Sequence, residues 1–202
     1  MADARQVALL LELVLRCHAR GWLQATSGNF SLRASADSFL ITASGLDKGR
    51  LTESDLGQVW LDGRVAFAPG QRPSAETPLH AALYARDPAI GAVAHTHSVA
   101  ATVLSRAAAA SKRVVELTGW EMAKGLRGVS SHRARVWLPV VDNDQDTTRL
   151  AASVDAVLGD APGYLIAGHG LYTWGRDVAE AARHLEALEF LLECELLQRR
   201  SS

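Results

Sequence analysis

The stretch Ala92-Val93-Ala94-His95-Thr96-His97-Ser98 decides how the rest of the chain is interpreted. Its first residues are small or β-branched, which predicts a short buried strand. On an extended backbone His95 and His97 point the same way, whereas on a helix they would diverge. Two imidazoles on one face can bind a metal ion. Hydrogen bonds from strand-end histidines to the backbone are the alternative that these residues leave open.

A third candidate ligand, His169, lies in Ile166-Ala167-Gly168-His169-Gly170-Leu171. It also follows an apolar, strand-like run, and its flanking glycines permit a sharp turn that aims the side chain into a cleft. Three histidines with an open coordination position are typical of a catalytic zinc or a related divalent ion. A structural zinc usually has four closed ligands, among them cysteine.

The composition is that of an ordinary globular chain. With 202 residues, 48% hydrophobic and 21% charged, it is long enough for one core and too short for two full domains, so we expect a single domain over residues 1–202. A net charge of -1 and the absence of a Lys/Arg run argue against nucleic acid as a partner. Because Glu12 interrupts the apolar run at 7–14, we expect no membrane span or signal peptide and a cytoplasmic location.

Two segments of small, hydrogen-bonding residues, 24–31 and 43–49, adjoin predicted strands at 30–33 and 39–42. Backbone N–H groups in such loops, together with the amine of Lys48, can hold phosphate oxygens. Neither segment carries a Walker or Rossmann fingerprint. Plain surface loops are the alternative, so the sequence predicts a phosphate cradle without deciding it.

Two glutamates are candidates for proton transfer. Glu76 lies at the start of a predicted helix with Pro78 in its first turn, where an acidic residue that complements the helix dipole is the ordinary alternative. Glu121 lies in a short helical turn between apolar residues, which raise the pKa of a carboxyl group and suit an acid/base role. An exposed Glu121 paired with Lys124 or Arg127 is the alternative, and the sequence alone does not choose.

The remaining pattern alternates strands and helices. An amphipathic helix is expected at 4–20, a hairpin around Asp62-Gly63, and a strand at 135–141 in which Pro139 favours an edge or terminal position. The acidic segment 142–146 lacks the glycine and distal glutamate of a calcium loop, so we interpret it as a turn that caps a helix at 147–158. A long helix follows Asp177.

Taken in order, five motifs resemble those of the class II aldolase/adducin family of zinc-dependent enzymes that act on phosphorylated ketoses: Thr26-Ser27-Gly28-Asn29, Thr42-Ala43-Ser44-Gly45, Pro73-Ser74-Ala75-Glu76, His95-Thr96-His97 and Gly168-His169-Gly170. The resemblance extends over essentially the whole chain. It implies an α/β fold with a central, mostly antiparallel sheet covered by helices on both sides. It also implies a cyclic homotetramer with the active site near a subunit interface.

The same resemblance assigns roles to individual residues. One zinc ion per subunit would be bound by His95, His97 and His169. A small sugar phosphate is the implied substrate, and the residues expected around it are Thr26, Gly28, Asn29, Ser44, Gly45, Lys48, Ser74 and Glu76.

Within the family, the chain is most similar to a branch of dehydratases in methionine salvage. The similarity lies in segments 95–98, 143–146, 168–175 and 189–195, and in Glu121 followed by Lys124. It predicts loss of water from a sulfur-bearing ketose 1-phosphate with Glu121 as the acid/base. In the aldolase branch the residue matching Glu76 takes that role, and this chain carries both glutamates. The alternatives are therefore a class II aldolase that cleaves a ketose 1-phosphate of the fuculose or ribulose type, and a non-catalytic adducin-like interaction module.

Overall fold

The computed structural model of the protein describes residues 3–111 and 113–200. The strands in this part of the chain are β1 (Asn29–Arg33), β2 (Ser38–Thr42), β3 (Leu56–Trp60), β4 (Val65–Ala66), β5 (Ala92–Thr96), β6 (Val114–Leu117), β7 (Val136–Val141), β8 (Gly163–Ile166) and β9 (Gly170–Gly175). The helices are α1 (Ala4–Ala19), α2 (Thr77–Arg86), α3 (Val99–Ala109), α4 (Thr147–Leu158) and α5 (Val178–Arg200), with 3-10 turns η1 (Glu53–Asp55) and η2 (Glu121–Gly125).

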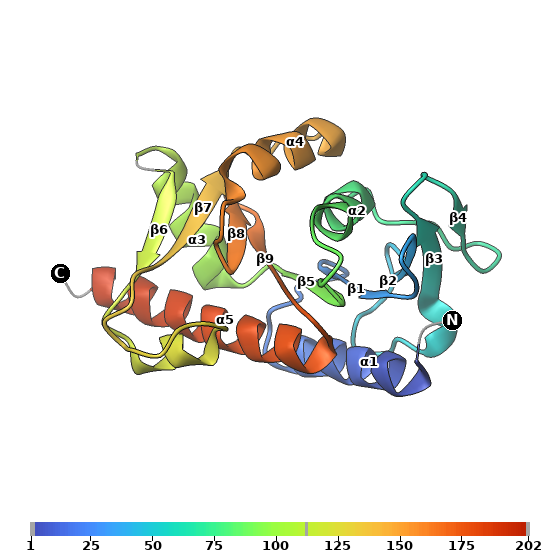
Figure 1. Cartoon of the computed structure of the whole chain (residues 1–202), viewed down its shortest axis with the longest axis horizontal. Coiled ribbons are helices and arrows are strands. Elements are labelled where there is room, and N and C mark those ends of the chain that lie inside the picture. Colours follow the sequence, from blue (N-terminus) through green and yellow to red (C-terminus); the bar gives the residue numbers. More distant parts are fainter. Residues whose placement is uncertain (1–2, 112, 201–202) are drawn as a thin grey trace.

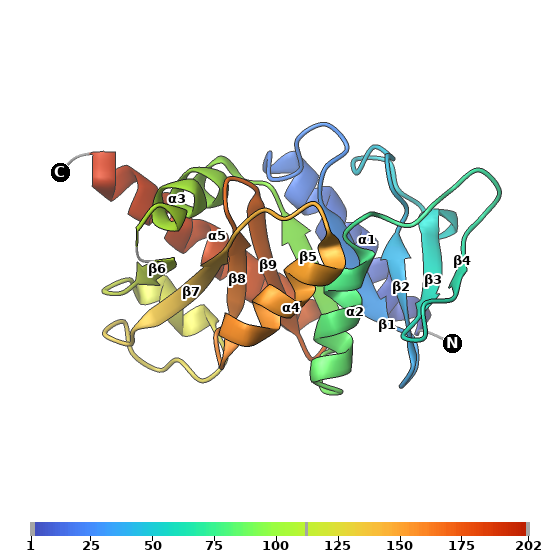
Figure 2. The same cartoon turned by 90° about the horizontal axis from the view of Figure 1, so that it is seen from above.

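Within the described residues the nine strands form one sheet in the order β4-β3-β2-β1-β5-β9-β8-β7-β6 (Figures 1 and 2). Neighbouring strands are antiparallel except β7 and β8, which are parallel. The predicted mostly antiparallel sheet is therefore confirmed. β5 lies at the centre, between β1 and β9, so the histidine-bearing strand is supported on both sides.

Helices cover both faces of this sheet, as predicted. One core packs side chains of α1, α3 and α5 against the sheet, and a second core packs those of α2 and α4 against the other face (Figure 1). The alternation of β5 reflects the two cores, because Ala92 and Ala94 belong to the first and Val93 to the second. Since side chains two residues apart share a face, His95 and His97 lie on the side of Val93 and α2.

Local sequence signals set most of the element boundaries. Ser98 accepts a hydrogen bond from the N–H of Ala101 at the start of α3, and Asp146 accepts two at the start of α4, which confirms the predicted cap there. Gly63 has φ +92 in the turn between β3 and β4, as the predicted hairpin requires. No helix in the described part of the chain is both long and apolar enough to cross a bilayer.

The expectation that Pro139 lies in an edge strand or at the end of a strand is wrong, because Pro139 is the fourth of the six residues of an internal strand. β7 lies between β8 and β6. Proline is tolerated there because β8 pairs with β7 only at Val140 and Val141, while Pro139 is paired with Val114 of β6. The residue that lacks an N–H group therefore lies in the part of β7 that has a single neighbouring strand.

Candidate metal centre

His95 is held rigidly by its strand. It is fully buried and lies opposite Asn29 of β1 and Tyr172 of β9. Its Nδ1 lies 2.9 Å from the carbonyl oxygen of Leu171, so Nδ1 donates to that oxygen, and the lone pair of the neutral ring is on Nε2. The Tyr172 ring stacks on the imidazole with centroids 3.9 Å apart. A histidine oriented by a backbone carbonyl in this way is typical of a metal ligand.

His169 reaches the same place from the turn between β8 and β9. Gly168 has φ +64, and a Cβ on Gly170 would collide with the carbonyl oxygen of Thr96, so both glycines are needed for the turn to approach β5. The hydroxyl of Thr102 donates to the carbonyl oxygen of His169 at 2.8 Å. As a result the His169 ring centroid lies 5.1 Å from that of His95 and 4.5 Å from that of His97.

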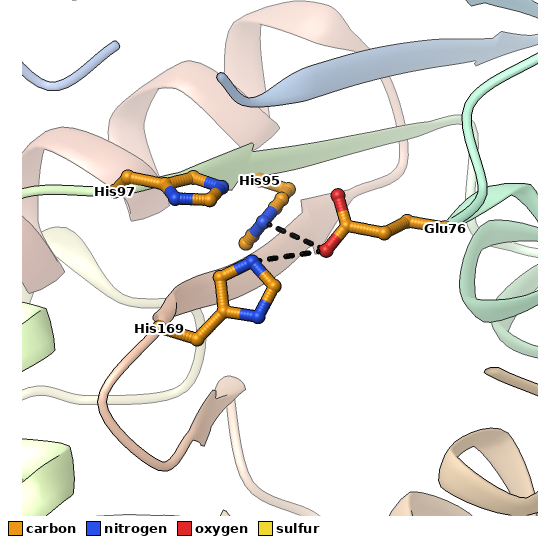
Figure 3. A group of neighbouring side chains, drawn as sticks. All are labelled: Glu76, His95, His97 and His169. Atoms are coloured by element: carbon orange, nitrogen blue, oxygen red, sulfur yellow. Dashed lines mark ion pairs between the residues drawn. The ribbon is translucent and has the colours of Figure 1, made fainter. Parts of the chain in front are cut away.

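Glu76 completes the group from the N-terminal end of α2 (Figure 3). Its Oε1 lies 3.4 Å from Nε2 of His95 and 3.1 Å from Nε2 of His169, and its Oε2 accepts a 2.5 Å hydrogen bond from Nδ2 of Asn29. One potential ligand atom from each of Glu76, His95, His97 and His169 lies within 4.8 Å of all the others. Burial opposes ionisation of Glu76, but His95 and His169 outweigh it and hold its pKa well below the usual range.

The residues present fit a divalent cation. Nε2 of His95, Nε2 of His97 and Oε1 of Glu76 are buried and have no hydrogen-bond partner within the described residues. Burial and the neighbouring imidazole of His95 lower the pKa of His97 to about 3, so this ring is neutral at ordinary pH. Converging lone pairs repel one another unless a cation lies between them. Three imidazoles with a carboxylate suit zinc and other divalent first-row ions.

The two small-residue loops converge beside this group. A single pocket is lined by His97, His169 and all eight residues expected around the substrate: Thr26, Gly28, Asn29, Ser44, Gly45, Lys48, Ser74 and Glu76. The eight residues come from three separate segments of the chain, and His97 and His169 come from two more, so their convergence depends on the fold and not on sequence proximity.

Lys48 supplies the positive charge of this pocket. The residue is only 2% exposed, and its Nζ donates to the carbonyl oxygens of Thr26 and Leu46, each at 3.0 Å. Burial lowers its pKa. Within the described residues no carboxylate forms an ion pair with Lys48, so the ammonium group, which has three N–H donors, keeps one donor for an anion in the pocket.

Glu121 is not part of this pocket or of the metal group within one chain. It begins η2, its side chain is 72% exposed, and its Oε1 accepts a 2.5 Å hydrogen bond from Nζ of Lys124. This hydrogen bond lowers the pKa of Glu121. The interpretation that apolar neighbours raise the pKa of Glu121 is therefore wrong. Met122 is itself 45% exposed and does not desolvate the carboxyl group. The ion-paired alternative is the one observed.

Sequence reasoning missed His80, which lies behind Glu76. The residue is fully buried on α2, and its Nε2 lies 2.5 Å from Oδ1 of Asn29. A signal was available, because Glu76, His80 and Tyr84 are spaced four residues apart and so share one face of a helix. A polar line on the buried face of a short helix indicates a hydrogen-bond network.

Comparison with known proteins defines the class of this protein. The model of the family described as "Class II Aldolase and Adducin N-terminal domain" matches residues 8–196. The L-fuculose-1-phosphate aldolase of Thermus thermophilus has a similar structure, with a TM-score of 0.78 at 29% identity, covering 98% of this chain and 95% of that one. The chain belongs to the class II aldolase and adducin family.

Its curated relatives narrow the comparison further. A methylthioribulose-1-phosphate dehydratase from Sorangium cellulosum (strain So ce56) is 56% identical over 95% of this chain and 91% of its own length. Another protein of that name, from Acidiphilium cryptum (strain JF-5), is 50% identical over 95% of this chain and 90% of its own length.

Proposed function

We propose that this chain is a zinc-dependent methylthioribulose-1-phosphate dehydratase of methionine salvage, which acts in the cytoplasm as a homotetramer with one zinc ion per subunit. The observation that carries the proposal is the 56% identity to a dehydratase of that name over nearly the whole chain. The metal group and the pocket beside it support a phosphorylated, oxygen-rich substrate.

His95, His97 and His169 would hold the ion, with Glu76 beside them. When bound, the divalent ion supplies a Lewis acid that polarises the carbonyl and hydroxyl oxygens of a ketose. The phosphate group would lie in the pocket of the two small-residue loops, where Lys48 provides the charge and backbone N–H groups provide further donors. The substrate is thereby anchored at one end and oriented at the reacting end.

In the proposed reaction, a carboxylate removes the proton from C3, the C4 hydroxyl leaves as water, and the enol that remains tautomerises to 2,3-diketo-5-methylthiopentyl 1-phosphate. One water is lost and the carbon chain is preserved. The proton taken from C3 is the one returned to the departing hydroxyl, so a single carboxyl group can act as base and then as acid.

We assign that carboxyl group to Glu121 of a neighbouring subunit. Three observations support a subunit contact at this place: Glu121 is exposed, Met122 and Phe190 are exposed large apolar residues, and both of these line one groove of about 800 Å³ between η2, α1 and α5. Exposed apolar surface of this kind is typical of protein interfaces. The proposed active site is thus composed of the metal group of one chain and Glu121 of another.

The second candidate is an aldolase that cleaves a ketose 1-phosphate. The position of Glu76 favours it, since this carboxylate lies beside the histidines within the same chain. Glu76 would then act as the acid/base, the role that the matching residue has in the aldolase branch. A non-catalytic interaction module is the weakest candidate, because the three histidines and Glu76 converge with unpartnered atoms in the described part of the chain.

Two measurements test the proposal: metal analysis of the gently purified protein, and incubation of the zinc-loaded protein with methylthioribulose 1-phosphate. We expect bound zinc near one equivalent per subunit and a product lighter by one water, with the absorbance of a diketone. Two smaller fragments in place of that product would identify an aldolase. Far less than one equivalent of zinc after gentle purification, together with unchanged substrate, would favour the interaction module.

A further inference from the structure

A line of polar side chains runs behind Glu76, between α2 and β1. Glu76 is the N-cap residue of α2, and His80 and Tyr84 follow it within the helix at intervals of four residues. On β1, Asn29 and Ser31 are two residues apart and face them. His80, Tyr84, Asn29 and Ser31 are each at most 3% exposed, so water does not compete for their hydrogen bonds.

The chemistry of these groups fixes the direction of every hydrogen bond. A carboxylate only accepts, so Asn29 must present its Nδ2 to Glu76, which it does at 2.5 Å. The amide oxygen Oδ1 then faces Nε2 of His80 at 2.5 Å, so Nε2 carries the proton. Nδ1 of His80 accepts from the Ser31 hydroxyl at 2.7 Å, and Ser31 accepts from the Tyr84 hydroxyl at 2.8 Å.

Glu76 requires Nδ2 of Asn29 to face it, and His80 holds the amide in that orientation from the Oδ1 side. Among the described residues, the other side-chain contact of Asn29 is a 3.5 Å approach of Nδ2 to Oγ of Ser74, which does not involve Oδ1. Burial, with a smaller contribution from His95, lowers the pKa of His80 to about 3. The ring is therefore neutral and carries one N–H proton. Because Nδ1 accepts from the Ser31 hydroxyl, that proton is on Nε2.

We propose that His80 is a positioning residue of the metal centre: its Nε2–H orients the Asn29 amide, which holds Oε2 of Glu76 and leaves Oε1 facing His95 and His169. The inference rests on the proposed metal site and extends it to a residue that lies outside the ligand group. Partners of this indirect kind typically change metal affinity by about 10- to 100-fold.

Three variants of His80 distinguish the functions of its two ring nitrogens. A glutamine at this position can donate from the place of Nε2, whereas an asparagine can only replace the function of Nδ1 toward Ser31. We expect His80→Gln to bind zinc within a few-fold of wild type, and His80→Asn and His80→Leu to lose affinity by about 10- to 100-fold. Zinc affinity is measured on the full chain by competition with a chromogenic chelator, so the readout does not depend on turnover.

Tyr84→Phe is the matched control. It removes a buried hydroxyl from the far end of the same line, but Ser31 can still donate to His80, so zinc affinity should stay within a few-fold of wild type. Thermal unfolding in the presence of chelator checks that the variants fold. If His80→Leu does not fold, the comparison of His80→Gln with His80→Asn tests the role of His80. Equal zinc affinity in His80→Gln and His80→Asn would overturn the role of His80. A wild-type chain that binds no zinc would instead overturn the proposed metal site.

Discussion

Glu76 and Glu121 are the same residue in two opposite environments. Glu76 lies against the central strand, its oxygens directed at His95, His169 and Asn29. Glu121 lies on a short turn next to α5, largely exposed, with the Lys124 ammonium group and the His132 ring as its neighbours. The Glu76 carboxylate is enclosed by other elements of its own chain, whereas the Glu121 carboxylate lies at the surface beside a neighbour on the same turn.

This difference separates binding from reaction. A carboxylate fixed among metal ligands suits a constant role in holding the centre, because Asn29 and the two histidines set its position. An exposed carboxylate can approach a substrate only when another surface closes over it. The two regions therefore predict different outcomes for the same Glu→Gln change.

The largest effect is expected for Glu121→Gln. Turnover should fall by about 10²- to 10⁴-fold, the usual contribution of a positioned acid/base, because the amide cannot accept a proton. Bound zinc should remain near one equivalent, since Glu121 is not in the ligand group. Steady-state kinetics and metal analysis measure both quantities. Glu116→Gln, an exposed glutamate on β6, is the control and should be close to wild type. Full activity of Glu121→Gln would contradict the assignment.

Mixed assemblies then test whether the two regions meet across subunits. Glu121→Gln and His97→Ala chains should each be inactive alone. Co-expression should restore part of the activity, because some pairs combine an intact metal group with an intact Glu121. If mass spectrometry shows mixed assemblies that have no activity, the proposed contact between subunits is wrong.

Glu76→Gln should have the next largest effect, and mainly on the metal. We expect zinc affinity to fall by at least about 10-fold, with a smaller loss of turnover at saturating zinc than in Glu121→Gln. Chelator competition and kinetics across zinc concentrations measure the two effects. Glu53→Gln on η1 is the control. A greater loss of turnover in Glu76→Gln than in Glu121→Gln would move the acid/base role to Glu76.

Lys48→Met should weaken substrate binding in the pocket that Lys48 shares with Glu76. Loss of a hydrogen bond to a charged group costs about 1.5–3 kcal/mol, so KM should rise by about 10- to 100-fold. The turnover number at saturation should change much less. Arg50→Gln, in the same loop with its side chain 87% exposed, should leave KM unchanged. An unchanged KM in Lys48→Met would place the phosphate elsewhere.

The smallest effect is expected for Lys124→Gln. Lys124 lowers the pKa of Glu121 through its hydrogen bond, and a general base must be ionised to act. Without Lys124 the pKa of Glu121 rises, so the acidic limb of the kcat/KM profile should move to higher pH. A pH profile measures this, with Arg133→Gln as the control. A limb that stays in place would show that Glu121 does not set it.

The sequence was sufficient where local rules determine the outcome. Strand periodicity predicted the direction of His95 and His97, and the turn at Asp62-Gly63 and the cap at Asp146 follow from side-chain chemistry within a few residues. The order of the strands was not accessible, because it depends on contacts between distant segments. Pro139 shows this, since its effect depends on where β8 begins to pair with β7.

The two glutamates required tertiary information. The contact of Glu76 with the histidines depends on how α2 approaches β5, which no local pattern encodes. For Glu121, the neighbouring residues in the sequence suggested a desolvated carboxyl group, but neighbours along a short turn do not enclose one another. His80 is a different case, because its helical spacing from Glu76 and Tyr84 was visible and was not used.

Gly170 has a consequence for protein engineering. The carbonyl oxygen of Thr96 occupies the space that any side chain at this position would need. A designer who transplants the three-histidine arrangement onto another scaffold must therefore copy this bare stretch of backbone as well as the imidazoles. A library that randomised only the ligand positions on a scaffold with alanine at the place of Gly170 would start from a turn that cannot close.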